Sequence, residues 1–192
     1  GVRTDGGSVV VDGSLRTTSK KIWAAGDVTG GLQFTHVAEY MAKTALRNAL
    51  VPGFSRVNYD TVPWVTYTDP EVAHVGLSQA EAEARGGTTY SYELDDLDRA
   101  IVDGEAFGVV KISAEPRGKV LGATILGAHA GELLMPLVLA MKHGLTLSDL
   151  ADTIWPYPTM AEGVKRASNE YQRARLDGTG GRLLKKVISW LT

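Results

Sequence analysis

The sequence contains no cysteine among its 192 residues. This absence excludes disulfide bonds, thiolate metal sites and a cysteine nucleophile within the chain. There is also no run of about 20 apolar residues, so no membrane-spanning helix is predicted. A net charge of −2 gives no support for a nucleic-acid partner. With an ordinary composition and no basic-then-apolar leader pattern, the chain is predicted to be a cytoplasmic globular protein with a sizeable core.

Histidine is scarce as well, and its positions do not suggest a metal centre. The four histidines lie far apart in the sequence, and no pair has the spacing of metal ligands. We therefore predict no metal site, and we interpret these side chains as structural or exposed. The histidines are His36, His74, His129 and His143.

Residues 17–50 carry the most specific pattern in the chain. A short apolar strand, predicted at 22–25, ends in Gly26 and Asp27, passes through two more glycines and enters a helix predicted over 35–50. A strand, a glycine-rich turn and a helix N-terminus together form a common site for a phosphate or an electron-rich ring. The Asp27 carboxylate would then accept hydrogen bonds from ligand hydroxyls. An ordinary strand–turn–helix unit without a ligand is the alternative.

The remainder of the chain reads as strands followed by helices. Two strands flank the turn Thr68-Asp69-Pro70, and Ser78 with Glu81 has the pattern of a capping box that opens a short helix. Consecutive strands with short turns predict an antiparallel sheet flanked by helices, which is an α+β fold. The further expected elements are strands at 88–95, 107–114 and 119–127 and helices at 130–143, 148–151, 160–175 and 182–191.

A second candidate site lies in the segment 155–163, Trp-Pro-Tyr-Pro-Thr-Met-Ala-Glu-Gly. Its residues alone have an ordinary structural interpretation. Tyr157 packs in a turn between two prolines, and Glu162 occupies the first turn of a helix, where the dipole favours a carboxylate. Glu162 is also placed to pair with Arg166 one turn later. Bonds between an aromatic residue and proline adopt the cis form more readily than most, so Tyr157-Pro158 is a candidate cis bond.

Three motifs in the same order resemble those of one enzyme family. The Gly26-Asp27 segment resembles the second flavin-binding motif of the FAD-dependent pyridine nucleotide–disulfide oxidoreductases. Two later motifs resemble the C-terminal dimerisation domain of the same enzymes, and the resemblance spans residues 17–172. These motifs are Pro63-x-Val65-x-Tyr67-Thr68-Asp69-Pro70-Glu71 and Gly127-x-x-Ala130-Gly131-Glu132.

The resemblance implies a division of the chain into three parts. Residues 1–53 would be the remnant of an FAD-binding α/β domain, residues 58–175 the dimerisation domain, and residues 176–192 a linker with an amphipathic C-terminal helix. In the family a redox cysteine pair and G-x-G-x-x-G nucleotide motifs precede these parts, and neither occurs here. We therefore expect a C-terminal fragment that is inactive by itself. For the last helix, docking on protein is favoured over contact with a membrane surface.

The resemblance also implies FAD as cofactor and NAD(P)H as electron donor. In the family the matching aspartate binds the ribityl chain, and the next helix points its N-terminus at the flavin ring. The partial positive charge of that N-terminus favours the anionic reduced flavin. The implied cofactor-binding residues are Gly26, Asp27, Thr35, His36, Val37 and Ala38.

The second site departs from the usual family pattern. Most members have a histidine acid–base catalyst where this chain has Tyr157, whereas Pro158, Thr159 and Glu162 match. A phenol has an ordinary pKa near 10 and is a poor base at neutral pH, so lipoamide or glutathione turnover is not expected. The branch with tyrosine here is mercuric reductase. The resemblance implies that Tyr157 and Glu162 are catalytic residues that face the flavin and cysteine pair of the partner in a homodimer formed through 58–175.

Two questions stay open at this point. Mercuric reductases end in a vicinal cysteine pair that this chain lacks, so the acceptor could be a mercuric ion, a disulfide or another small molecule, and NADH and NADPH are both candidate donors. The alternative function is a non-catalytic dimerisation or interaction module.

Overall fold

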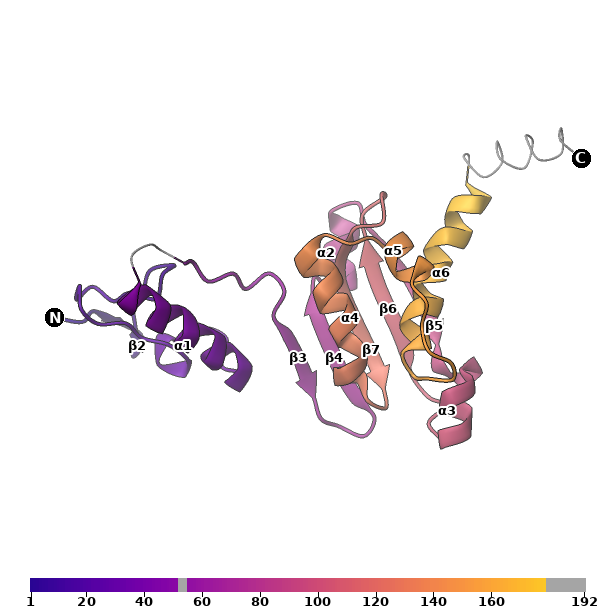
Figure 1. The fold of residues 1–192 in the computed structure, drawn as a ribbon, viewed down its shortest axis with the longest axis horizontal. Coiled ribbons are helices and arrows are strands. Elements are labelled where there is room, and N and C mark those ends of the chain that lie inside the picture. Colours follow the sequence, from indigo (N-terminus) through magenta and orange to yellow (C-terminus); the bar gives the residue numbers. More distant parts are fainter. Residues whose placement is uncertain (52–54, 179–192) are drawn as a thin grey trace, which may run out of the picture. The chain divides into compact units, whose positions relative to one another are not determined.

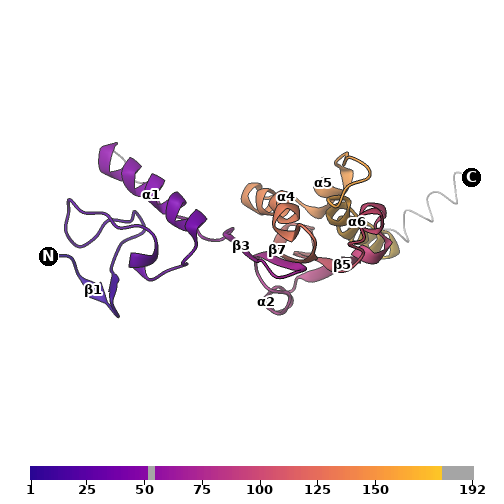
Figure 2. The same ribbon diagram turned by 90° about the horizontal axis from the view of Figure 1, so that it is seen from below.

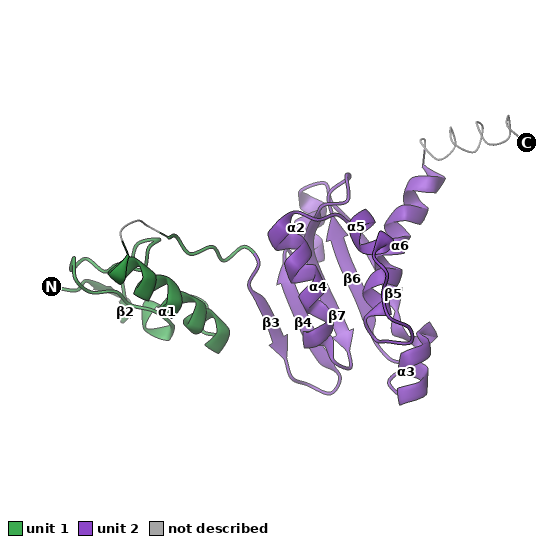
Figure 3. Ribbon diagram, in the orientation of Figure 1, with its two compact units in different colours: residues 1–60 green, residues 61–192 purple. Residues whose placement is uncertain are grey.

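The computed structural model describes residues 1–51 and 55–178. The chain divides into two compact units, Gly1–Asp60 and Thr61–Thr192 (Figure 3). The domain boundary expected at residue 53 and the helix expected over 182–191 lie outside the described residues. Within residues 1–51 and 55–178, no helix is both long and apolar enough to cross a membrane.

Unit 1 begins with very short strands. Strands β1 (Thr4–Asp5) and β2 (Ser8–Val9) form an antiparallel hairpin, and the 3-10 helix η1 (Asp27–Thr29) follows. The strand expected at 22–25 is wrong, because Trp23 makes only an isolated bridge with Arg16. A strand needs a continuous ladder of partners, and in this unit the chain beside 22–25 supplies a single bridge.

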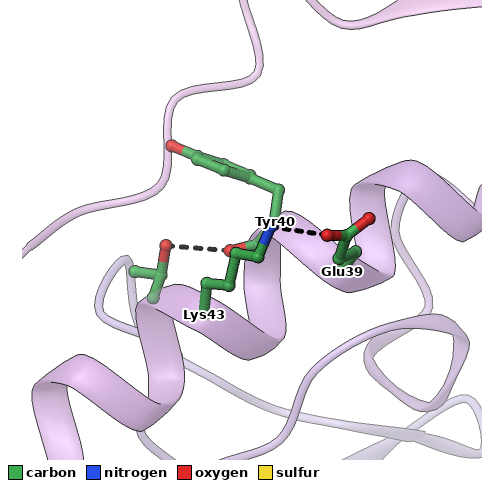
Figure 4. Close-up of polar contacts among 4 residues, drawn as sticks. Glu39, Tyr40 and Lys43 are labelled. Carbon is green, nitrogen blue, oxygen red and sulfur yellow. Dashed lines mark hydrogen bonds and ion pairs between the residues drawn. The ribbon is translucent and has the colours of Figure 1, made fainter.

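Helix α1 (Thr35–Leu50) closes unit 1 and confirms the helix expected over 35–50. It buries Val37, Met41, Thr44 and Ala45 along one face, as the 3.6-residue period requires. Tyr40 is exposed, and its hydroxyl accepts a hydrogen bond from the Asn58 amide at 3.1 Å. Figure 4 shows the outer surface of the helix, where Lys43 pairs with Glu39.

Unit 2 is built on a five-stranded antiparallel sheet in the order β3-β4-β7-β6-β5 (Figure 1). This sheet and its helices confirm the expected α+β class, and the turns fall where the sequence predicted them. The strands are β3 (Pro63–Thr66), β4 (Glu71–Gly76), β5 (Thr88–Glu93), β6 (Val109–Ala114) and β7 (Val120–Gly127).

Helices pack against this sheet and enclose the core of unit 2 (Figures 1 and 2). Helix α4 (Ala130–His143) contacts β4 and β7, and α6 (Glu162–Asp177) contacts β5 and β6. Helix α5 (Leu147–Asp152) packs against α6. Helix α2 (Gln79–Ala84) opens with the predicted capping box of Ser78 and Glu81. The largest fully buried side chains of the core include Val75, Leu94, Leu97, Val110, Ile112, Ile125, Leu134, Leu137, Leu147 and Val164.

The two dimerisation-domain motifs meet in space. Glu71 on β4 accepts a hydrogen bond from the Gly131 amide through Oε2 at 3.1 Å. A Cβ atom at Gly131 would lie 3.2 Å from Val65 Cγ2, so a side chain there would press on strand β3. The carboxylate satisfies an amide of the first turn of α4, whose groups have no partner inside the helix. These motifs therefore fix the start of α4 on the sheet.

The segment between β5 and β6 holds two elements that the sequence pattern did not reveal. The 3-10 helix η2 (Leu94–Asp96) leads into helix α3 (Asp98–Asp103), which ends at Gly104 in a left-handed conformation. Leu97 and Ala100 are buried and anchor this segment to the core.

Candidate functional site

The first candidate site lies in unit 1, where the turn at Gly26 contacts the start of α1. Gly26 has φ 78° and ψ −155°, a region almost restricted to glycine. A Cβ atom there would lie 3.1 Å from the Cβ of Ala38. The close approach brings Gly26 and the exposed Asp27 to the first turn of the helix. The structure therefore assembles the predicted cofactor-binding residues in one place.

The N-terminus of α1 has no side-chain cap. Phe34 at the N-cap makes no capping hydrogen bond, and the first turn contains no acidic residue. The helix end therefore keeps its partial positive charge for a ligand. Thr35 and His36 are exposed, and the His36 ring stacks on Phe34 with centroids 5.3 Å apart. Val37 is only 2 % exposed, so its side chain belongs to the core and only its main chain is left for a ligand.

These features fit a flavin. An uncapped helix N-terminus suits an electron-rich ring edge, a glycine without a side chain lets the main chain approach closely, and an exposed carboxylate suits ligand hydroxyls. The groups whose chemistry suits a flavin are Gly26, Asp27 and the first turn of α1.

The second candidate site lies in unit 2, on the loop between α5 and α6. Trp155 anchors the loop by donating a hydrogen bond from Nε1 to the Leu150 carbonyl at 2.9 Å. Thr159 closes the turn by donating from Oγ1 to the Pro156 carbonyl at 2.8 Å. The Tyr157-Pro158 bond is cis. Between these anchors Tyr157 points outward and is 68 % exposed.

Tyr157 and Glu162 are not hydrogen-bonded to each other. The Tyr157 hydroxyl donates to Oδ2 of Asp98 at 2.8 Å. This hydrogen bond, and then the negative charge of Asp98, raise the pKa of the Tyr157 hydroxyl above its ordinary value. Tyr157 thus lies in the expected turn, but its side chain is exposed and does not pack into the core.

Glu162 is buried at the start of α6, with only 9 % of its surface exposed. Its Oε2 atom has no hydrogen-bond partner in the described part of the chain. The ion pair with Arg166 that helical spacing suggested is not formed; Arg166 instead lies over the Tyr92 ring, 5.9 Å from its centroid. A buried carboxylate oxygen without a donor is costly, and such an atom is often completed by a group from outside the chain.

Asp98 is the site residue that sequence reasoning missed. It lies 59 positions from Tyr157, so no local spacing connects the two. A weak signal for its helix was present, because an acidic first turn at Asp98 and a glycine at 104 mark the two ends of α3. Among residues 1–51 and 55–178, no three His, Cys, Asp or Glu side chains gather in a way that could hold a metal ion.

Comparison with known families places both units. The model described as pyridine nucleotide-disulphide oxidoreductase, dimerisation domain, matches residues 62–168. The model described as pyridine nucleotide-disulphide oxidoreductase matches residues 1–42. The chain belongs to the pyridine nucleotide-disulphide oxidoreductases. This family uses FAD and NAD(P)H, and unit 2 contains its dimerisation domain.

Within this family, the similar proteins include mercuric reductases. A mercuric reductase from Bacillus cereus is 44 % identical over 164 residues, which cover 84 % of this chain and 26 % of the relative. A mercuric reductase from Streptomyces lividans is 39 % identical over 175 residues, covering 89 % of this chain and 37 % of the relative. The chain is thus mercuric reductase-like and spans about a quarter to just over a third of the length of these relatives.

Solved structures of the family share the fold. The HOCl-induced flavoprotein disulfide reductase RclA from Escherichia coli superposes with a TM-score of 0.83 at 29 % identity, over 88 % of this chain and 40 % of that one. LpdA from Mycobacterium tuberculosis gives a TM-score of 0.83 at 31 % identity, over 88 % of this chain and 38 % of that one.

Proposed function

We propose that this chain forms the dimer interface and part of the FAD site of an NAD(P)H-dependent oxidoreductase. Tyr157 and Glu162 then act at the redox centre of the partner subunit. The observation that carries this proposal is the dimerisation-domain match over 62–168, since both residues lie inside it. The accompanying division is an FAD-domain remnant over 1–53, a dimerisation domain over 58–175 and a C-terminal segment over 176–192.

In this proposal unit 1 binds the cofactor through its main chain and one carboxylate. FAD, when bound, supplies two-electron transfer between NAD(P)H and the acceptor. Asp27 accepts hydrogen bonds from the ribityl hydroxyls, and Gly26 permits their close approach. Thr35, His36 and Val37 present the start of α1 to the flavin ring, where its partial positive charge favours the anionic form. Ala38, whose amide donates to the Phe34 carbonyl, contributes the small side chain that lets Gly26 approach the helix.

Unit 2 contributes a phenol where an acid–base histidine is usual. A hydroxyl whose pKa lies above the ordinary phenol value is a poor proton acceptor at neutral pH. Glu162 has no imidazole to orient at position 157, and its buried Oε2 has no donor among the described residues. Such a site suits an acceptor that needs no base, and a soft metal ion held by the partner's thiolates is the example that the mercuric reductase relatives suggest.

The homodimer places each Tyr157 at the other subunit's redox centre. Unit 2 exposes apolar side chains on α4 and on the loop before Tyr157, including Met135, Leu139 and Ile154. Ile154 is 95 % exposed, so cover by a partner would remove much apolar area from water. An isologous dimer would bury this surface twice and form two equivalent sites.

The test is the solution mass of the chain by light scattering over a wide concentration range. We expect a dimer whose mass does not change with concentration, and we expect Leu139→Glu to give a monomer. The control is Leu50→Glu, which places the same charge on an exposed leucine of α1 in unit 1 and should leave the dimer intact. A monomeric parent chain, or a Leu139→Glu dimer as stable as the control, would contradict the proposed interface.

The rival function is a dimerisation module without a redox role. It makes the same prediction for the mass but not for the cofactor. Under our proposal, Asp27→Ala in the flavin-loaded enzyme increases the loss of FAD during dialysis, because ribityl hydrogen bonds are removed. Under the rival, FAD retention does not depend on Asp27.

A further inference from the structure

The hydrogen bond between Tyr157 and Asp98 joins two separately anchored elements. Tyr157 lies on a loop held by Trp155 and Thr159. Asp98 opens α3, which is fixed to the core by the buried Leu97 and Ala100. The backbone on each side is therefore held by its own packing, and the 2.8 Å bond joins two exposed side chains that these anchored elements carry.

We propose that Asp98 is a positioning residue: it holds the neutral Tyr157 hydroxyl so that the phenol oxygen can accept a hydrogen bond or act as a ligand. A phenol can donate a single hydrogen bond, and in Tyr157 this hydrogen bond goes to Asp98. The oxygen lone pairs are then what Tyr157 presents to an incoming electron acceptor. This inference rests on the proposed role of Tyr157 and specifies it. The hydroxyl oxygen accepts a hydrogen bond from the substrate or binds it as a ligand, and the hydroxyl neither donates a proton to the substrate nor acts as a phenolate.

The charges around the hydroxyl agree with this role. The groups that act on it are Asp98 from α3 and Glu162 and Arg166 from α6, and the first two oppose ionisation of the phenol. Arg166 acts in the other direction, but it lies over the Tyr92 ring. The phenol oxygen therefore lies beside a carboxylate in a negative local field. A cationic or electron-poor acceptor is favoured at such a site over a carboxylate or a phosphate.

The test is an ultraviolet titration of tyrosinate in the full chain. Seven tyrosines are present, so the difference from Tyr157→Phe isolates the curve of Tyr157. We expect that curve above the ordinary phenol pKa in the parent chain. Asp98→Asn removes the charge and Asp98→Ala removes the acceptor, so both should lower the pKa of Tyr157. The Asp98 charge also raises the pKa of Tyr92, so each Asp98 variant is compared with the same variant carrying Tyr157→Phe, and the difference gives the Tyr157 curve alone.

The matched control is Asp95→Asn, which removes the same charge three residues earlier in the chain. It should leave the Tyr157 curve in place, because Asp95 is not among the groups that act on this hydroxyl. If Asp98→Asn and Asp95→Asn give the same Tyr157 curve, or if the parent curve lies at the ordinary value, Asp98 does not position the hydroxyl.

A kinetic comparison separates this inference from the proposed function. In the complete flavoenzyme of which we propose this chain to be a part, loaded with FAD, NAD(P)H-dependent reduction is measured with mercuric ion supplied as its bis-thiolate complex. Should Tyr157→Phe leave turnover unchanged while Asp98→Asn lowers the Tyr157 pKa, the proposed function fails and the positioning contact remains. Should Tyr157→Phe reduce turnover while Asp98→Asn moves neither the pKa nor KM, the positioning role fails alone.

Discussion

The two candidate sites are built in different ways. In unit 1 the site consists of main-chain groups at the start of α1, a glycine turn and the carboxylate of Asp27. In unit 2 it consists of side chains, Tyr157, Asp98 and Glu162, that three elements of a well-packed domain bring together. Unit 2 contains a five-stranded sheet, whereas the described residues of unit 1 form two strands of two residues each.

The difference teaches where each site is sensitive. A site made of main-chain groups depends on local backbone conformation, so one glycine can disable it. A site made of side chains from distant elements depends on the core that holds those elements in register. Substitutions in the core of unit 2 should therefore disturb the side-chain site, and a substitution at the glycine turn of unit 1 should disturb the main-chain site.

The largest expected effect comes from the core of unit 2. Leu134 on α4 is fully buried, and Leu134→Ala should cost about 3 kcal/mol of the unfolding free energy of unit 2, through lost burial and a residual cavity. Hydrogen exchange read by mass spectrometry should show protection lost over 61–178 and kept over 1–51. Met41→Ala, at a buried position of α1, is the matched variant and should give the reverse pattern. Simultaneous loss in both units would mean that they unfold together.

A smaller effect is expected at the turn of unit 1. Gly26→Ala places a Cβ atom 3.1 Å from Ala38 in a backbone region reserved for glycine, and it should cost about 1–3 kcal/mol of the stability of unit 1. Gly31→Ala is the control, since a Cβ atom there meets nothing within 4 Å. Thermal unfolding of the two variants, compared with the parent, measures the difference. Equal melting temperatures for both variants would show that the Gly26 turn is not constrained.

Local signals made much of the fold predictable. The capping box of Ser78 and Glu81, the periodicity of α1 and the turns of the sheet are written in neighbouring residues, and the structure confirms them. The strand expected at 22–25 failed because an apolar run specifies a strand only when partners complete its ladder. Helix α3 was missed because six residues give too short a period to recognise.

The sites show the same division. Gly26 and Asp27 stand out because a glycine turn before a helix is a local pattern. Tyr157 and Glu162 were found by resemblance to a family motif, and helical spacing suggested that Glu162 pairs with Arg166. In the structure the Tyr157 hydroxyl donates a hydrogen bond to Asp98, and Oε2 of Glu162 is buried without a hydrogen-bond partner among the described residues. Which carboxylate a side chain reaches depends on long-range packing, which spacing along the chain does not contain.

A helix cap provides a finer comparison of the two units. Ser78→Ala removes the hydroxyl that accepts from the Glu81 amide at the start of α2, and it should cost about 1 kcal/mol of the stability of unit 2. Thr35→Ala, at the first residue of α1, removes no cap, because none is formed there. Urea unfolding of both variants measures this contrast. A loss at Thr35 as large as that at Ser78 would mean that α1 is capped after all and is less open to a ligand.

The smallest effect should come from the exposed pair of Glu39 and Lys43 on α1 (Figure 4). The hydrogen bond and charge of Lys43 lower the pKa of the Glu39 carboxyl below its ordinary value. A depressed pKa means that the pair stabilises unit 1 above the ordinary carboxyl pKa and that this contribution disappears as the pH falls through the folded-state value. Lys43→Gln should therefore raise the pKa of Glu39 in a carbon-detected NMR titration and should destabilise unit 1 at neutral pH but not in acid.

The equivalent pair in unit 2 is Arg99 with Asp103 on α3, and Arg99→Gln is the matched variant. Both pairs are solvent-screened, so both should change stability less than Ser78→Ala does. That outcome would place the difference between the units in their cores and backbone turns. If Lys43→Gln instead destabilised unit 1 more than Gly26→Ala, surface charge would dominate the smaller unit, and the contrast between a main-chain site and a packed side-chain site would no longer explain how the two differ.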